Sequence, residues 1–368
     1  TATAAAALPK AGGTMTGNLA TAGISAVTAG TSNFVAGVNA GNSITSGGNY
    51  NTVVGDEAGT AITTGGFNTA LGYAALDANT TGTANHAIGT SSLTNNTTGS
   101  NNTSVGSGSL YNNTTASNNT AVGYTALLAN TTGTRNTAVG KDAGKSITTA
   151  SENTVVGCLA GDAITTGTKN NFFGDSAGTS VTTGNYNVAI GNAALSSATT
   201  ASDNTAVGQA ALTSNTTGTS NTAVGTESLT ANTTANYNTA HGHKALKANT
   251  TGAGNTATGF VSLTANTTGS YNSGHGSETL YSNTTGANNT ASGVQALYFN
   301  TTASYNTATG YRSLFYNTTG ASNTAVGWYS LFSNTTGGNN IAIGTSALQV
   351  NTTGSANAAV GLSCLDSN

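Results

Sequence analysis

A seventeen-residue repeat organises this chain from residue 51 to its last residue. Its pattern is Asn-Thr-Ala-Val-Gly, two variable residues, Ala-Leu, two further variable residues, Asn-Thr-Thr-Gly and a last pair of variable residues. We number the positions of the repeat from its first Asn, so the first Gly is at position 5. That Gly recurs in unbroken steps of 17 from Gly55 to Gly361, which gives nineteen copies. A short fixed period without insertions is typical of a solenoid, so the chain is expected to form a rod.

The residue types within the repeat favour a parallel β-solenoid. Two short runs, Thr-Ala-Val and Asn-Thr-Thr, have high β-propensity, and each is closed by Gly or Ala where the backbone must turn. Asn, Thr and Gly in the centre of the unit exclude a helical repeat. Two short strands per coil are expected, and nineteen coils stacked at about 4.8 Å would form a rod of roughly 90 Å. The predicted fold is an all-β β-roll of about nineteen 17-residue coils.

Several repeat positions do not vary, and they predict ladders of identical side chains along the rod. Position 1 is Asn and position 5 is Gly in all nineteen copies, and positions 13 and 14 are Thr-Thr in every complete copy. Stacked Asn amides and Thr hydroxyls can pass hydrogen bonds from coil to coil. A ladder of this kind can serve as a binding surface, but satisfied turns and strands are the favoured interpretation. The predicted ladder residues include Asn51, Asn68, Asn119, Asn136, Gly55, Gly72, Gly123, Thr80, Thr81, Thr131 and Thr132.

Covariation within the repeat indicates which side chains share the interior. Where position 9 is Leu, position 12 is Asn, as in Leu76 with Asn79; where position 9 is Gly, position 12 is aliphatic, as in Gly59 with Ile62. Two positions that exchange one large apolar group are expected to fill the same space in a close-packed core. Side-chain alternation then predicts that position 14 also points inward and that the Thr at position 13 points outward.

The composition leaves few groups for chemistry. Charged residues make up 5% of the chain, and the formal net charge is -3. These values give no reason to expect nucleic acid as a partner, and the absence of a run of about 18 apolar residues argues against membrane insertion. No nucleophile with a base, paired carboxylates or phosphate loop is recognisable. We therefore expect no enzyme activity.

The predicted core is thin, which favours association of several chains. Each coil offers about four small or medium apolar side chains, and their burial adds little against the cost of ordering the coil. Position 3 is nearly always Ala, and it is expected to allow close approach of chains packed side by side. The sequence therefore predicts a homo-oligomer of several chains packed side by side.

Position 4 changes character in five consecutive copies. It is aliphatic or Phe from Val54 to Val224, becomes His241, Thr258, His275, Ser292 and Thr309, and returns to Val at Val326. Five polar groups in a dry core would be costly, but at an axis between chains they could satisfy one another. His241 and His243 form a His-x-His pair. An axial metal ion bound by His241, His243 and His275 is one hypothesis, and a hydrogen-bonded polar seam is the favoured one.

Aromatic residues gather in the late copies. Exposed aromatic groups bind sugars, proteins or another copy of the same chain. The predicted contact residues for a host-surface glycan or protein are Tyr311, Phe315, Tyr316, Trp328, Tyr329 and Phe332.

Two segments resemble known fibrous proteins. The Asn-Thr-Ala-Val-Gly phrase resembles the β-roll head repeats of trimeric autotransporter adhesins, whose repeat is shorter. This resemblance implies that the expected oligomer is a homotrimer. Residues 7–19, Ala-Leu-Pro-Lys-Ala-Gly-Gly-Thr-Met-Thr-Gly-Asn-Leu, are similar to a segment common in bacteriophage tail fibres. The resemblance implies a connector at residues 1–32 and a solenoid shaft at residues 33–368. Because the chain stops inside a repeat, we expect it to be a fragment, a processed product or a segment joined to something else.

These patterns predict a structural fibre protein located in a virion tail fibre or outside the cell. The expected role is a phage tail-fibre shaft that gives reach and host-surface attachment. A bacterial surface adhesin and a self-assembling extracellular filament are alternatives that differ in what lies upstream and downstream. An ice-binding solenoid is a weaker alternative, because adjacent Thr-Thr residues point to opposite faces rather than forming flat Thr-x-Thr rows.

Overall fold

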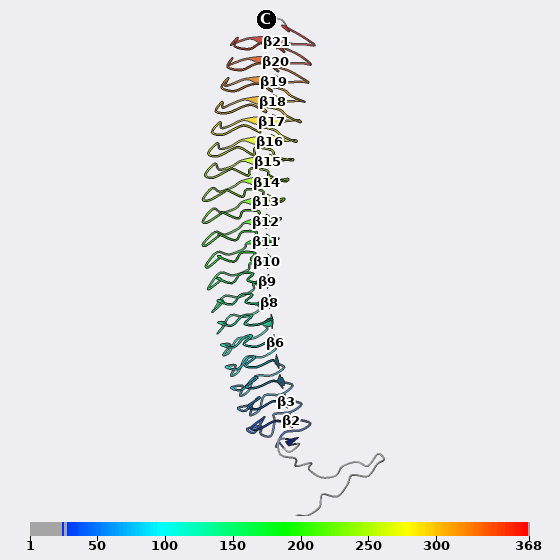
Figure 1. The fold of residues 1–368 in the computed structure, drawn as a ribbon, viewed down its shortest axis with the longest axis vertical. Helices are drawn as coiled ribbons and strands as arrows, with labels where there is room; N and C mark the ends of the chain where they lie inside the picture. The colour runs from blue at the N-terminus through cyan, green and yellow to red at the C-terminus, as the bar shows by residue number, and fades with distance from the viewer. Residues whose placement is uncertain (1–23, 26–27, 367–368) are drawn as a thin grey trace, which may run out of the picture.

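The chain folds into a single curved stack of β-coils (Figure 1). The computed structural model describes residues 24–25 and 28–366. Residue number rises steadily from one end of the rod to the other, so each coil lies between its two neighbours in sequence (Figure 1). The predicted parallel β-solenoid is confirmed.

One strand from each coil joins a single sheet that runs the length of the rod. Each strand pairs in parallel with the strand of the next coil; from β3 onward equivalent residues are 17 apart, whereas β2 and β3 are offset by 18. β1 is the exception, since it pairs antiparallel with β2 at the N-terminal end. The strands are β1 Ile24–Ser25, β2 Phe34–Ala36, β3 Thr52–Val54, β4 Thr69–Leu71, β5 His86–Ile88, β6 Thr103–Val105, β7 Thr120–Val122, β8 Thr137–Val139, β9 Thr154–Val156, β10 Asn171–Phe173, β11 Val188–Ile190, β12 Thr205–Val207, β13 Thr222–Val224, β14 Thr239–His241, β15 Thr256–Thr258, β16 Ser273–His275, β17 Thr290–Ser292, β18 Thr307–Thr309, β19 Thr324–Val326, β20 Ile341–Ile343 and β21 Ala358–Val360.

The rest of each coil is built from turns, so the prediction of two strands per coil was wrong. Strands occupy only positions 2 to 4, and the Asn-Thr-Thr run forms bends. Positions 7, 9 and 17 adopt left-handed φ values, as in Ala74 (51°), Leu76 (55°) and Ala84 (55°). A left-handed residue between right-handed ones reverses the direction of the peptide plane. This allows the turns to hydrogen-bond to both neighbouring coils.

Backbone hydrogen bonds in the turns show this alternation. The Ala74 amide donates to the carbonyl of Asp56 in the preceding coil at 3.0 Å, whereas the Leu76 amide donates to Ser92 in the following coil at 3.0 Å. Bonds between coils therefore continue around much of the perimeter and are not confined to the sheet. This satisfies backbone groups that a turn would otherwise leave unpaired.

The core lies inside the coils and is formed by positions 3, 8, 9 and 12. Ala121, Ala126 and Leu127 of one coil are fully buried. Position 3 therefore fills the interior of its own chain, and the expectation that it mediates approach between chains was wrong. Strand alternation then places positions 2 and 4 on the outward face. The expectation that position 14 points inward was also wrong, because Thr81 and Thr132 are exposed at the bend.

The exchange between positions 9 and 12 is confirmed as a packing effect. A Cβ built on Gly59 would lie 2.7 Å from Cδ1 of Ile62, and one built on Gly161 would lie 2.8 Å from Cδ1 of Ile164. The aliphatic side chain at position 12 therefore occupies the space that Leu fills in other coils. At Gly178 the intruding group is the ring of Phe172, which would lie 2.3 Å from such a Cβ.

Two columns of buried Asn hold each coil closed. At position 1, the Asn136 side chain accepts a bond from the Asn153 amide at 3.0 Å and donates to the carbonyl of Ala150 in its own coil at 2.8 Å. At position 12, Nδ2 of Asn96 donates to Oδ1 of Asn79 at 2.8 Å. This column is interrupted after Asn130, whose Oδ1 has no partner, because the next coil carries Ile147 at position 12. It resumes at Asn215 and continues to Asn351.

The predicted Thr ladder involves the first Thr of each pair. Oγ1 of Thr80 donates to the carbonyl of Thr97 at 3.0 Å, and Oγ1 of Thr131 donates to that of Thr148 at 3.2 Å. These hydroxyls are engaged along the rod rather than displayed as a free row. The predicted fibre-like segment at residues 7–19 lies outside the described residues. The described part of the chain contains no helix long and apolar enough to cross a membrane.

Candidate functional site

A column of stacked aromatic rings runs along the late coils at position 10. Ring centroids are 4.9 Å apart between Tyr281 and Tyr298, 5.3 Å between Tyr298 and Phe315, and 5.4 Å between Phe315 and Phe332. These distances are close to the spacing of strands in a sheet, so the column follows directly from the coil repeat. Interplanar angles of 3°, 24° and 11° show that the rings are stacked. Burial raises the pKa of the Tyr298 hydroxyl.

Further rings extend this column sideways into a continuous patch. Phe299 stacks on Tyr316 at 5.5 Å, and both meet Phe315 edge to face. Tyr329 contacts Phe332 at 4.6 Å and Trp328 at 4.1 Å. We call the whole group the aromatic surface; its members are Tyr281, Tyr298, Phe299, Tyr311, Phe315, Tyr316, Trp328, Tyr329 and Phe332. It brings together all six aromatic residues that the sequence singled out.

The members of the aromatic surface differ in exposure. Phe315 is only 8% exposed and supports its neighbours, whereas Trp328 is 50% exposed and Tyr316 is 43% exposed. The accessible rings therefore rest on a packed base and are not isolated side chains. Rings held in this way lose little conformational freedom when a ligand stacks on them.

A polar row lies beside the aromatic column at position 7. Nε of Arg312 donates to Oε1 of Gln295 at 2.6 Å, and Nε2 of Gln295 donates to Oε2 of Glu278 at 2.6 Å. The Arg312 guanidinium also lies over the rings of Tyr311 and Phe315, at 5.2 and 5.0 Å from their centroids. Exposed rings together with fixed donors and acceptors can bind a ligand that has both apolar faces and hydroxyl groups, such as a sugar.

Sequence reasoning missed Glu278, Gln295 and Arg312. These residues are spaced 17 apart and all occupy position 7, so the repeat register already contained the signal. A table of variable positions ordered by coil would have placed them in one row.

The histidines proposed as metal ligands are not assembled within one chain. His241 and His275 are exposed at position 4, two coils apart, and His275 is 3.1 Å from the Ser273 hydroxyl. His243 follows Gly242, whose φ of 134° turns the backbone, and stacks on Phe260 at 5.5 Å. No group of three or more His, Cys, Asp or Glu able to hold a metal occurs in the described part of the chain. Binding between chains stays a prediction.

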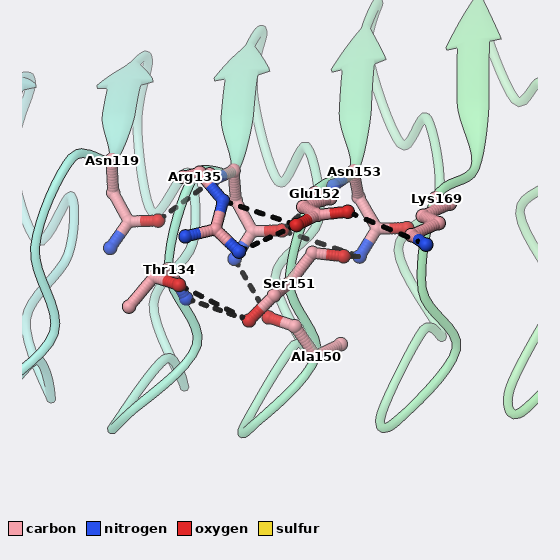
Figure 2. A network of polar contacts seen from close by, with 9 residues as sticks. Asn119, Thr134, Arg135, Ala150, Ser151, Glu152, Asn153 and Lys169 are labelled. Carbon is pink, nitrogen blue, oxygen red and sulfur yellow. Dashed lines mark hydrogen bonds and ion pairs between the residues drawn. The ribbon is translucent and has the colours of Figure 1, made fainter.

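Charged residues on the rod form short rows that also follow the repeat. Figure 2 shows Arg135, Glu152 and Lys169 from three successive coils, with Arg135 Nη2 2.5 Å and Lys169 Nζ 3.9 Å from the carboxylate oxygens of Glu152. The buried Asn column and the Ser151 hydroxyl lie beside this row (Figure 2). Exposed pairs of this kind contribute little to stability. The row therefore gives the surface its charge pattern but does not hold the coils together.

A buried carboxylate predicts a specific pH dependence. Asp142 accepts bonds from Thr125 Oγ1 and Lys141 Nζ, both at 2.5 Å, and lies 3.3 Å from Lys145 Nζ. The Lys141 and Thr125 bonds lower the pKa of Asp142 from 3.8 to about 2. A depressed pKa stabilises the fold above pH 3.8, and the contribution is lost as pH falls through about 2. We expect Asp142→Asn to lower the free energy of unfolding by about 1–2 kcal/mol at pH 7 and to change it little near pH 2. The value at pH 7 includes a reduction for solvent screening, because the lysines are exposed.

Amide hydrogen exchange around β7 and β8, in Asp142→Asn and the parent chain at pH 7, 4 and 2, measures this effect. The exposed Asp203→Asn is the control and should leave protection in these strands unchanged at pH 7. A difference between Asp142→Asn and the parent chain that is the same at every pH would contradict the role of the carboxylate charge.

Comparison with protein-family models and with curated proteins finds no match for this chain.

Proposed function

We propose that this chain is the shaft of a multichain attachment fibre that carries a host-contacting surface in its late coils. A phage tail fibre fits best, because the rod geometry is joined to the fibre-like segment at residues 7–19. The single observation that supports the role most strongly is the long stack of coils (Figure 1), whose late coils carry the aromatic surface. A rod of this kind gives reach, and side-by-side copies give several contacts at once.

The proposed ligand of the aromatic surface is a host-surface glycan. Trp328 and Tyr316 offer exposed ring faces on which the apolar side of a sugar ring can stack. Arg312 and Gln295 lie in the polar row beside them and can bond to sugar hydroxyls. Tyr311, Phe315, Tyr329 and Phe332 complete the contact. The proposed location of the protein, in a virion tail fibre or outside the cell, is part of the same proposal.

Loss of the Trp328 ring is expected to weaken glycan binding at least tenfold. Exposed aromatic anchors commonly contribute about 2 kcal/mol or more to binding. The measurement is binding of the full chain to an array of bacterial surface oligosaccharides, compared with Trp328→Ala. Tyr237→Ala is the matched control, because Tyr237 is 70% exposed but lies outside the aromatic surface. Failure of the parent chain to bind any glycan, or equal binding by Trp328→Ala, would contradict the glycan role.

A further inference from the structure

The outward face of the long sheet is an exposed, nearly uncharged surface. Position 3 of every strand points into the core, and positions 2 and 4 point out. Position 2 is mostly Thr. Position 4 is apolar in fourteen of the nineteen coils, and its most exposed members within the rod are Leu71 at 47% and Ile190 at 41%. We call these fourteen residues the apolar stripe; they are Val54, Leu71, Ile88, Val105, Val122, Val139, Val156, Phe173, Ile190, Val207, Val224, Val326, Ile343 and Val360.

The apolar stripe has the extent of a protein interface. Eight of these side chains are exposed and six are partly buried. Together they offer on the order of 800 Å² of surface, which is about what each partner of a stable complex buries. None of the 8 Lys and Arg or 11 Asp and Glu residues lies at position 2 or position 4 of the nineteen copies. Soluble sheets usually place charges on exposed strand faces to prevent association. The absence of charge here favours a covered face.

The spacing of the stripe favours another copy of this chain as the partner. It presents one apolar group per coil at the strand spacing of about 4.8 Å, over a length that few partners could match residue by residue. A second copy has the same coil spacing along its length. Its own apolar stripe is uncharged in the same way, so the two faces are chemically self-complementary.

The five polar residues at position 4 restrict how two copies can align. His241, Thr258, His275, Ser292 and Thr309 occupy coils twelve to sixteen, counted from the coil of Gly55. In a full-length antiparallel pair, all five would face apolar residues of coils four to eight. Any axial shift of a parallel pair also buries polar groups against apolar ones, which is costly. Full overlap without mismatch requires parallel copies in register, where each polar group meets its own equivalent.

We propose that copies of this chain associate through the outward faces of their sheets, parallel and in register, and that the polar residues at position 4 set this register. The inference deepens the shaft function proposed above and rests on it, because it states how the chains of the fibre meet. The aromatic surface lies on positions 6, 7, 10 and 11, outside the strand, so it stays accessible when the outward face is covered.

The first experiment measures the mass of the full chain in solution by sedimentation. The parent chain is expected to form a defined oligomer, and Leu71→Lys with Ile190→Lys is expected to weaken association at least a hundredfold, because in-register lysines would be buried next to each other. The control is Thr81→Lys with Thr200→Lys, which adds the same charge to the same two coils at exposed position 14. Circular dichroism should show the same strand signal for all three proteins.

Two outcomes of this experiment would overturn the inference, with different consequences. If the parent chain associates and the lysine pair in the stripe does not weaken it, the interface inference fails and the shaft function stands. If the parent chain is monomeric at tens of micromolar, the inference fails together with the multichain part of the proposed function. Glycan binding by the aromatic surface is measured separately and is unaffected by either result.

A second experiment tests the register by disulfide cross-linking. In a background with Cys158→Ser and Cys364→Ser, Val122→Cys should cross-link to itself in parallel, in-register copies, because equivalent residues lie at the same height. An antiparallel pair that uses only the first eleven coils would instead place Val122, in coil five, opposite Val156, in coil seven. Cross-linking only in a mixture of Val122→Cys and Val156→Cys chains would therefore overturn the proposed register.

Discussion

Replacement of Gly123 by alanine is expected to destabilise the middle of the rod by about 3–5 kcal/mol, since it combines an unfavourable backbone conformation with a steric clash. Gly123 occupies position 5 with a φ of 140°, a region that residues with a Cβ rarely adopt. An added Cβ would lie 2.3 Å from the carbonyl oxygen of Gly140 in the next coil. Because neighbouring coils are hydrogen-bonded around the perimeter, the backbone has little freedom to relax.

The effect should be measured locally, by amide hydrogen exchange. A long repeat array does not unfold in one step, so a single unfolding midpoint would average over coils that the change does not reach. Protection should fall in β7 and β8 and remain near parent values in β18. The control is Gly108→Ala at position 7, where φ is 68° and a Cβ would meet only ordinary contacts, the nearest at 3.4 Å. Equal protection in Gly123→Ala and Gly108→Ala would contradict the clash.

Replacement of Asn136 by alanine is expected to lower the local free energy of unfolding by about 2–5 kcal/mol, because it leaves buried backbone groups without partners. The side chain is 1% exposed, accepts from the Asn153 amide at 3.0 Å and donates to the Ala150 carbonyl at 2.8 Å. Water cannot replace these bonds in a fully packed core. The change therefore breaks both the link between coils and the closure of one coil.

Amide exchange around β8 and β9 measures the loss. Asn192→Ala is the matched control, because Asn192 is exposed and bonds only at the surface; it should change stability by less than about 0.5 kcal/mol. Asn136→Asp separates the two roles of the side chain, since a carboxylate can accept from Asn153 but cannot donate to Ala150. Equal stability of Asn136→Ala and Asn192→Ala would show that the Asn column is dispensable.

Part of the candidate site was predictable because it depends on repeat spacing. Residues such as Phe315 and Phe332 occupy the same position in successive coils, and the solenoid necessarily brings them together. The register places Arg312 in one row with Gln295, but their hydrogen bond was not predictable, because it depends on how the position 7 side chains leave the turn. Sequence spacing gives the coil of a residue but not the direction of its side chain.

The sequence by itself determined the rod, the length of each coil and the packing exchange between residues such as Gly59 and Ile62, because these follow from a strict period and from conservation of core volume. Only the tertiary structure decided which way each position faces. The left-handed residues at positions 7, 9 and 17 redirect the chain, so strand alternation cannot be extended through the turns. This is why position 14 points outward, position 3 fills the core and position 4 lies on the exposed face.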